Sequence, residues 1–387
     1  MILFWLGGVV LASLIIMFAC NSFEDASGHL GRNMPAGVRG ATIDAVGSSL
    51  PELLTTFVLL FFFLDEDGFS GGVATCAGSA VFNAIVIPAV CIVAVLFIGV
   101  KVTQSTADSG SLLRAGRYRP KGITVGKGTI LRDGFFFLIA EMVLITFLGG
   151  NTMHWWMGGV LMLIYAWYFG FLMWQFKKHG TTDEDDDEDD DPLEQVGFLK
   201  ALLTLNGNQL FFGGLPLNTP KAWIVLGWAV AWIGLACYGL SHSVVEISHI
   251  LNIPLYFTTV ILAAAATSVP DTVISVKSAL NGDYDDAISN AIGSNIFDIT
   301  VALGFPLLVF GLVYGDVTLT STEGTTSDVQ ILRIALLAFT TITFVIFLTG
   351  KQMGKVKAIL LSSLYFIWTL FIIGRALQWE WLDKIVG

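Results

Sequence analysis

The chain has 387 residues, of which 55% are hydrophobic and 13% are charged, and its mean hydropathy is +0.74. Soluble domains carry roughly 25% charged residues, so this composition excludes an ordinary soluble protein and indicates an integral membrane protein. The net charge of −11 comes mostly from nine acidic residues in one unbroken run, Asp183 to Asp191. Without that run the chain is close to neutral, so no overall acidic character needs a functional explanation.

The first apolar stretch, residues 2–20, lacks the basic start and the small-residue cleavage site of a signal peptide. We therefore expect it to be a retained membrane span. The cysteines lie in apolar segments without metal-ligand spacing, which predicts buried, reduced thiols. They are Cys20, Cys76, Cys91 and Cys237.

The number of spans follows from the length of the apolar runs. A hydrocarbon core about 30 Å thick needs roughly 20 apolar residues for each helix that crosses it. The sequence therefore predicts an all-α integral membrane protein of ten transmembrane helices. The expected spans are 2–20, 40–64, 70–99, 133–150, 154–176, 222–245, 255–280, 286–313, 329–349 and 356–376.

Loops with basic residues alternate with loops that have none. Lys and Arg follow the first, third, fifth and ninth spans, whereas loops 65–69, 149–153 and 314–328 contain neither. Because basic loops mark the cytoplasmic side, we expect both termini on the outer side of a plasma (inner) membrane.

The long connection 177–221 divides the chain into two halves of five spans. We expect a first five-helix repeat over 1–176, an acidic cytoplasmic linker over 177–221 and a second five-helix repeat over 222–387. Charge repulsion should keep the acidic run 183–191 solvated and disordered. A solubilising hinge and a loose calcium-sensing or calcium-buffering role both stay open, although the run lacks an EF-hand pattern.

The spacing of prolines reveals an internal repeat. The offset from Pro51 to Pro270 is identical to the offset from Pro35 to Pro254. Because five spans separate matching elements, the two copies must have opposite orientations in the membrane. This is the inverted-repeat signature of secondary transporters, whose substrate site lies near the midplane between broken helices.

Each copy places a proline beside a carboxylate within an apolar run, as Gly47-Ser-Ser-Leu-Pro-Glu52 and as Ala266-Thr-Ser-Val-Pro-Asp271. A carboxylate at that depth costs several kcal/mol and is a functional-site hypothesis by default. Each proline also releases the carbonyl four residues back, at Gly47 or Ala266. Such carbonyls must face protein or a wet cavity, and a bound cation would satisfy them.

A second pair of motifs supplies further oxygens. Gly78-Ser-Ala-Val-Phe-Asn83 matches Gly293-Ser-Asn-Ile-Phe-Asp298 at a slightly shorter offset, and the polar residues of each share an i, i+4 helix face. With oxygen ligands and no His or Cys, the motifs suit calcium, sodium or potassium and argue against zinc or copper. Any single hydroxyl has an equally good alternative role in an ordinary helix hydrogen bond.

Together these motifs resemble the two alpha-repeats of the calcium/cation antiporter superfamily, most closely its potassium-dependent sodium/calcium exchanger branch. The resemblance is carried by Gly47–Glu52 with Gly78–Asn83 and by Thr267–Asp271 with Ser289–Asp298, and the ten-span plan extends it along the chain. It implies an antiporter that exchanges calcium for sodium by alternating access, with Glu52 and Asp271 as the main calcium ligands. The other implied or proposed ligands are Ser48, Ser49, Thr267, Ser268, Ser79, Asn83, Ser294, Asp298 and the carbonyls of Gly47 and Ala266.

The asymmetry between Asn83 and Asp298 bears on potassium. Three ionised site carboxylates carry a charge of −3, so calcium alone leaves −1, whereas calcium with potassium neutralises the set. A proton on Asp298 would have the same effect. We therefore hypothesise that Asp298 makes transport sensitive to potassium.

Alternatives to this interpretation differ in class. Within transporters, the rival is proton-coupled exchange of calcium or another divalent cation. A membrane aspartyl protease using Asp271 and Asp298 would require neither Glu52 nor inverted symmetry, and a passive channel would need no counter-ion. We expect no enzyme, no cofactor, no nucleic acid and no protein partner, with the bilayer and the transported ions as partners. Glu141, within the fourth span, has either a role near the ion path or a structural hydrogen bond.

Overall fold

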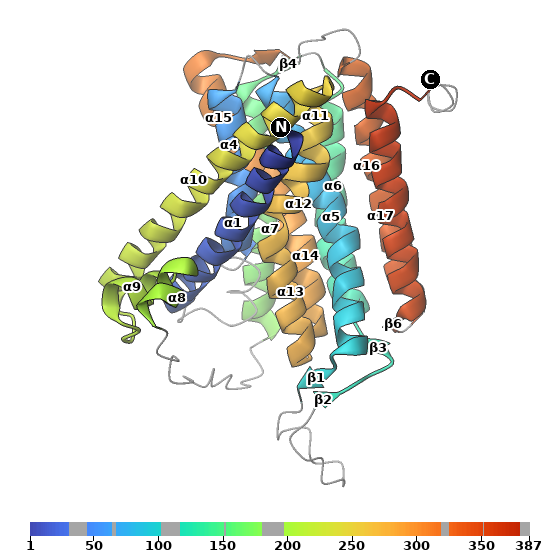
Figure 1. Ribbon diagram of the computed structural model, residues 1–387. Helices are drawn as coiled ribbons and strands as arrows, with labels where there is room; N and C mark the ends of the chain where they lie inside the picture. The colour runs from blue at the N-terminus through green and yellow to red at the C-terminus, as the bar shows by residue number, and fades with distance from the viewer. Residues whose placement is uncertain are drawn as a thin grey trace.

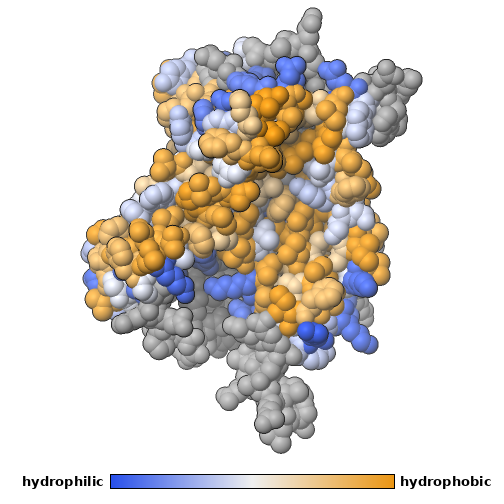
Figure 2. Space-filling view, in the orientation of Figure 1, coloured by the Kyte–Doolittle hydropathy of each residue, from blue (hydrophilic) through white to orange (hydrophobic). Residues whose placement is uncertain are grey.

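The computed structural model describes residues 1–30, 45–63, 67–101, 117–150, 152–179, 197–318, 325–350 and 352–379. Within these ranges the chain is mostly helical, and long helices run side by side between the upper and lower ends of the view in Figure 1. Much of the surface seen in Figure 2 is hydrophobic along the helices, as expected where lipid surrounds a protein. The acidic run 183–191 lies outside the described residues.

Helices cover most of the expected spans in the described ranges. In the first half they are α1 (Ile2–Leu30), α3 (Ala45–Ser48), α4 (Leu50–Phe62), α5 (Gly68–Phe97), α6 (Lys127–Phe147) and α7 (Trp155–His179). The short helices α8 (Phe198–Leu203) and α9 (Gly207–Phe212) precede α10 (Thr219–Leu251). The second half continues with α11 (Leu255–Thr258), η4 (Thr259–Ala263), α12 (Ala264–Thr267), α13 (Val269–Asn281), α14 (Tyr284–Phe297), η5 (Asp298–Ala302), α15 (Leu303–Tyr314), α16 (Thr325–Leu348) and α17 (Lys355–Ala376).

Local sequence explains where such helices start and stop. The side chain of Asn218 accepts a hydrogen bond from Lys221 N at 3.1 Å, and Pro220 occupies the first turn of α10. Asn252 ends that helix with φ of 53°, a left-handed conformation that asparagine tolerates better than most residues. Between these signals the 33 residues of α10 are predominantly apolar.

Six of the described helices are long and apolar enough to cross a membrane, and a bent pair makes up to seven. The bent pair is Leu255–Thr267 with Val269–Asn281, which meet at an angle of 41°. Leu50–Phe62 and Ile334–Leu348 are shorter apolar helices. The described parts are therefore mostly helical and make an integral membrane protein, while the count of ten spans and the inversion of two five-helix repeats remain predictions.

Three short strand pairs tie the loops together at the two ends. At the lower end in Figure 1, β1 (Val100–Lys101) pairs with β2 (Arg117–Tyr118), and β3 (Gly122–Ile123) pairs with β6 (Met353–Gly354). At the upper end, β4 (Thr152–Met153) pairs with β5 (Val317–Thr318). Among the described residues, Arg117, Lys121 and Lys355 therefore lie in or beside strand pairs at one end, whereas β4 and β5 at the other end contain no Lys or Arg.

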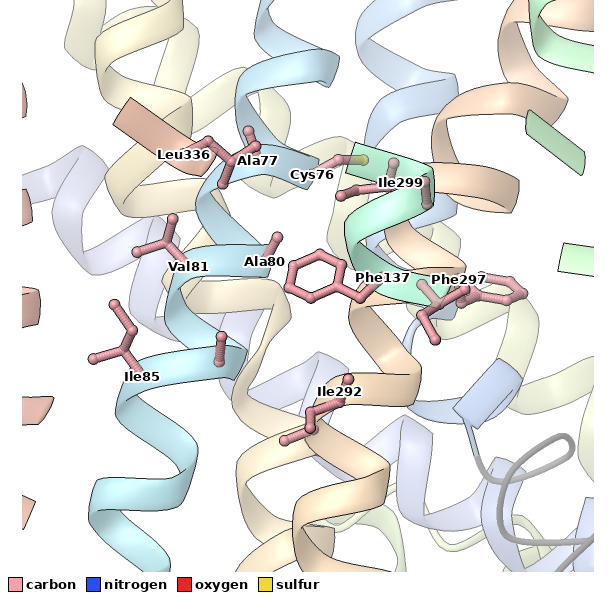
Figure 3. Close-up of a cluster of buried hydrophobic side chains, with 14 of the residues drawn as sticks. Cys76, Ala77, Ala80, Val81, Ile85, Phe137, Ile292, Phe297, Ile299 and Leu336 are labelled. Carbon is pink, nitrogen blue, oxygen red and sulfur yellow. The ribbon is translucent and has the colours of Figure 1, made fainter. Parts of the chain in front are cut away.

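Two clusters of buried hydrophobic residues form the interior. The larger joins α5 to α6, α14, α16 and their neighbours, and Figure 3 shows the Phe137 ring of α6 pointing toward Ala80 of α5. The smaller is built mainly from α1 and α10, which lie against each other at a slant to the other helices in Figure 1. The broken helices α3–α4 and α12–α13 lie between these two bodies, because α4 and α13 pack on α5 while α1 and α10 contact α3, α4, α12 and α13.

The prediction for the cysteines is confirmed. Cys20, Cys76, Cys91 and Cys237 are all free and buried.

Candidate cation site

The two proline-containing motifs have the same backbone structure. Helices α3 and α12 have the same length, α4 and α13 have the same length, and one constant offset along the chain relates both pairs. The break falls at Ser49 in the first copy, with φ −95° and ψ 4°, and at Ser268 in the second, with φ −79° and ψ 4°. Both prolines occupy the first turn of the helix that follows, where a missing N–H is tolerated. The sequence repeat is therefore a repeat of broken helices.

The breaks bring both main carboxylates into the interior. Glu52 and Asp271 lie in the first turns of α4 and α13, and both side chains are fully buried. A helix N-terminus stabilises a negative charge, so each break places its carboxylate at a favourable helix end. This local effect is small compared with the cost of burying an unpaired carboxylate, so further partners are required.

Ser79 of α5 connects the carboxylates of the two halves. Its hydroxyl lies 2.8 Å from Asp298 Oδ2, 3.3 Å from Glu52 Oε1 and 2.9 Å from the hydroxyl of Ser268. Ser268 Oγ also lies 3.5 Å from Glu52 Oε1. A hydroxyl has one proton to donate, so Ser79 cannot serve both carboxylates at once.

Asp271 accepts hydrogen bonds from both copies of the second motif. Asn83 Nδ2 donates to Asp271 Oδ2 at 3.1 Å, and the Ser294 hydroxyl donates to Asp271 Oδ1 at 2.8 Å. Asn83 Nδ2 also lies 3.2 Å from the Ser79 hydroxyl. The four motifs, which are far apart in the sequence, thus form one hydrogen-bonded cluster between α4, α5, α13 and α14–η5.

Several oxygens of this cluster lack a hydrogen-bond donor. Within the described parts of the chain, Ser49 Oγ, Glu52 Oε2, Asn83 Oδ1 and Asp298 Oδ1 are buried and have no partner at full hydrogen-bond geometry, although Ser49 lies beside the Asp298 carboxyl group. Buried polar atoms are normally satisfied, so a group of unsatisfied acceptors in one cluster requires an explanation. A cation would supply the missing positive charge to each of them.

Carboxylates alone do not make this site. Among the residues that the structure describes, no three His, Cys, Asp or Glu side chains are placed to hold a metal ion. The side chains between the carboxylates are hydroxyls and an amide, whose oxygens are also ligands for hard cations. A cation bound here would take a mixed oxygen set drawn from both halves.

Two of the predicted ligand hydroxyls hydrogen-bond backwards along their own helices. Ser48 Oγ donates to Ala45 O at 3.3 Å, and Thr267 Oγ1 lies 3.1 Å from Ala263 O and 3.2 Å from Ala264 O. This is the ordinary role of hydroxyls in membrane helices, which the sequence left open for each of them. Both side chains are buried beside the breaks, so their roles as ligands stay a prediction.

The two carbonyls released by the prolines face α1. Cys20 Sγ donates to Gly47 O at 3.7 Å, and Ser13 Oγ donates to Ala266 O at 3.2 Å. Side chains of one helix therefore satisfy both predicted ligand carbonyls. The sequence contained a signal for this pair, since the i, i+7 spacing of Ser13 and Cys20 puts them on one face of α1.

Asn290 also belongs to the cluster and was absent from the predicted ligands. Its Nδ2 lies 3.0 Å from Ser275 Oγ and 3.5 Å from the carbonyl oxygen of Asp271. The spacing of Asn290, Ser294 and Asp298 at i, i+4 and i+8 could have indicated a continuous polar face on α14.

The helix that carries Asp298 changes its winding at that residue. Helix α14 ends at Phe297, and the π-helical turn η5 covers Asp298 to Ala302. In the first copy, Asn83 lies inside the uninterrupted α-helix α5. Single π turns often mark functional positions, because they redirect a side chain from the regular helix face.

Glu141 lies in a different place. Its side chain is fully buried on α6, and its Oε1 accepts from the Thr340 hydroxyl of α16 at 3.2 Å. Its Oε2 has no hydrogen-bond partner among the described residues. The hydrogen bond joins two helices of the larger hydrophobic cluster and does not involve the four motifs.

A second polar cluster, near the lower end, is better satisfied. Asp133 is fully buried and pairs with Arg132, whose Nε and Nη2 lie 2.6 and 2.9 Å from its two oxygens. Tyr168 and Ser289 also donate to Asp133, at 3.2 and 2.7 Å. These bonds join α6, α7 and α14. Asp133 is therefore a buried carboxylate whose oxygens both have hydrogen-bond donors and a counter-charge.

Long apolar helices around a buried cluster of carboxylate, hydroxyl and amide oxygens define a membrane protein with an ionisable polar centre. The family model described as sodium/calcium exchanger protein matches residues 4–174 and 221–374, which is most of the chain. The protein therefore belongs to the sodium/calcium exchanger family, a family of membrane antiporters.

Similar proteins agree with this assignment. Human sodium/potassium/calcium exchanger 5 is 25% identical over 390 residues, covering 78% of this chain and 71% of that protein. Mouse sodium/potassium/calcium exchanger 2 is 31% identical over 141 residues, which cover 36% of this chain and 21% of that protein. The crystal structure of the H⁺/Ca²⁺ exchanger CAX matches with a TM-score of 0.60 at 15% identity, over 99% of this chain and 91% of that one. At that identity the structural match shows a shared fold.

Proposed function

We propose that this protein exchanges calcium for sodium across the membrane by alternating access. The observation that carries this proposal is the set of buried oxygens without donors at Glu52, Asn83 and Asp298. These residues come from both sequence repeats and meet around Ser79. A divalent cation with a preference for oxygen ligands is the substrate that best fits such a group.

In this proposal Glu52 and Asp271 are the main calcium ligands, because each lies in the first turn of the helix that follows a break. Ser79, Asn83, Ser294 and Asp298 complete the side-chain set, with Ser49 and Ser268 at the breaks themselves. Ser48, Thr267 and the carbonyls of Gly47 and Ala266 join it if the breaks rearrange during transport. Residues 1–176 and 222–387 would be the two inverted five-helix repeats whose relative movement exposes the site alternately to each side.

Sodium is the proposed counter-ion because the family and its similar members are named for sodium and calcium exchange. Co-transport of potassium is supported by two facts. The similar human and mouse proteins are named sodium/potassium/calcium exchangers. The third carboxylate, Asp298, also leaves a charge of −1 that calcium alone does not neutralise.

Proton-coupled calcium exchange is the second candidate. The geometry at Ser79 favours it, because one hydroxyl lies between two carboxylates that would repel each other when both are ionised. A proton shared there would relieve that repulsion. The similar fold of the H⁺/Ca²⁺ exchanger CAX shows that this architecture also occurs in a proton-coupled protein.

Uptake of calcium-45 into proteoliposomes separates the candidates. We expect an outward sodium gradient to drive uptake at constant pH, and a pH gradient without sodium to drive little or none. Uptake that follows the pH gradient and ignores sodium would favour the proton-coupled exchanger. Uptake that needs no counter-ion at all would indicate a channel.

The proposed orientation places the β3–β6 end in the cytoplasm. Lys121, Lys127, Lys355 and Lys357 lie in or beside this strand pair, and basic residues are retained on the cytoplasmic side. The proposed location is the plasma or inner membrane, with both termini outside. Labelling Lys221→Cys in intact cells with a membrane-impermeant maleimide tests this, since we expect labelling only after the membrane is opened.

A further inference from the structure

A groove runs between α5 and α17 on the outside of the helix bundle. It encloses about 640 Å³ and is separate from the four motifs. Its walls are apolar apart from two serines and one lysine, and several wall residues are well exposed, Phe97 at 69% and Phe366 at 62%. The lining residues are Val93, Leu96 and Phe97 of α5 with Lys355, Ala358, Ile359, Ser362, Ser363, Phe366 and Ile367 of α17.

The length of the groove matches one leaflet of a bilayer. Its lining on α17 extends from Lys355 to Ile367, which at a rise of about 1.5 Å per residue corresponds to roughly 18 Å. The hydrocarbon half of a bilayer is about 15 Å thick. An apolar groove of this length, open to the membrane, has the dimensions of a single acyl chain.

Lys355 lies at the end of the groove where a lipid headgroup would lie. It is the first residue of α17, directly after β6, and its side chain is exposed. Within the described parts of the chain no carboxylate lies within ion-pair distance of it. The neighbouring Lys357 is already engaged, since its Nζ donates to Phe347 O at 3.1 Å.

Positive charge surrounds this end of the groove. Lys121 precedes β3 and Lys127 begins α6, so both lie next to the β3–β6 pair from which α17 starts. In Figure 2, the hydrophobic surface on this side of the molecule is bordered below by hydrophilic atoms, at the end where Figure 1 places β6. Asp285 of α14 lies beside the start of α6, and its carboxylate is engaged by the Gly126 N–H at 2.6 Å.

We propose that the α5–α17 groove binds one anionic phospholipid from the leaflet at the β3–β6 end. The acyl chain lies along the apolar walls, and the headgroup phosphate pairs with Lys355. Basic grooves between membrane helices are a recognised way to hold anionic headgroups, and each lysine near an anionic surface contributes about 1 kcal/mol. This site depends on neither the transported ion nor its coupling.

Native mass spectrometry of the full chain tests this site. The protein is released from nanodiscs that contain equal amounts of phosphatidylglycerol and phosphatidylcholine with identical acyl chains. We expect one retained lipid, with phosphatidylglycerol preferred, and an approximately fivefold loss of that preference in Lys355→Gln. The matched control is Lys221→Gln, which removes a lysine from the first turn of α10, where it lies 5.3 Å from the Phe212 ring centroid.

A second variant tests the groove itself. Ser363→Trp fills part of the volume from an exposed position, so we expect fewer retained lipids of both kinds without loss of folding. The proposal is overturned if the wild type shows no headgroup preference, or if Lys355→Gln and Lys221→Gln behave alike. It is equally overturned if light scattering shows a dimer that Ser363→Trp dissociates, because a second copy of the chain would then cover this face.

Discussion

The two broken helices differ far less than the helices that pack against them. The breaks at Ser49 and Ser268 share their backbone angles, and the hydrogen bonds that flank them match residue for residue. Ser49 N and Ser268 N donate to the alanines four residues back, at 3.0 and 3.1 Å. Even the helix ends agree, since one constant offset relates the first and last residues of each element to those of its counterpart.

The second motifs depart from this symmetry. Asn83 lies within a regular helix, whereas Asp298 begins a π turn and adds a third carboxylate to the cluster. Both positions contact Ser79, but only Asp298 brings a negative charge to it. The duplicated backbone therefore holds an unsymmetrical set of charges. Under the proposed function, the extra carboxylate at Asp298 decides whether a second cation binds together with calcium.

The largest expected effect comes from removing one of the two carboxylates that lie at the matching helix breaks. Glu52→Gln or Asp271→Asn removes a buried charge that the cation must balance, and uncompensated changes of this kind cost about 3–5 kcal/mol. We therefore expect calcium-45 uptake to fall by at least about a hundredfold in each variant. Glu246→Gln, a half-buried position on α10, is the control and should transport normally. Normal transport in Glu52→Gln would contradict the ligand assignment.

Making the two copies alike tests the charge difference. Asp298→Asn gives the second copy the amide of the first, so the remaining site charge matches calcium alone. We expect this variant to transport calcium with little or no response to potassium, whereas wild-type uptake should rise several-fold when potassium is added. Potassium titrations of sodium-driven uptake measure the difference. The hypothesis fails if wild-type uptake ignores potassium and Asp298→Asn changes nothing.

The two carbonyls that α1 satisfies provide a smaller test. Ser13→Ala leaves the buried residue Ala266 without the half-buried donor to its carbonyl oxygen, which should lower the free energy of unfolding by about 1 kcal/mol. Cys20→Ala should cost less, because a thiol is a weak donor and its contact with Gly47 O is longer. Thermal unfolding in detergent measures both, with Ser27→Ala on the same helix as the control. Equal decreases in the free energy of unfolding for all three variants would show that the hydrogen bonds from α1 do not stabilise the helix breaks.

The smallest effect is expected at Glu141, which lies outside the four motifs. An ionised Glu141 without a counter-charge would cost several kcal/mol at this buried position, so we expect its carboxyl group to be uncharged. An uncharged carboxyl group has nearly the shape of the glutamine amide. Glu141→Gln should therefore keep calcium uptake within about twofold of the wild type, since Thr340 can still donate to the amide oxygen. A loss comparable to that of Glu52→Gln would place Glu141 in the ion path after all.

The sequence predicted the repeat and the identity of the clustered side chains because both depend on local signals. A proline next to a carboxylate in an apolar run predicts a break wherever it occurs, and the constant offset between the two prolines carried over to the helix boundaries. Contacts between helices that are far apart in the sequence were harder to predict. The donors Ser13 and Cys20 reach the breaks only because α1 passes both, and no local pattern in the sequence indicated the π turn at Asp298.

The central claim is that the two repeats complete one calcium site, and calorimetric titration of the purified protein with calcium tests it most directly. We expect the wild type to bind calcium with one-to-one stoichiometry at this site, and Glu52→Gln and Asp271→Asn each to abolish that binding. The double variant should then be no worse than either single variant. If each single variant instead keeps a full calcium site and only the double variant loses binding, the two repeats hold separate sites and the account is wrong.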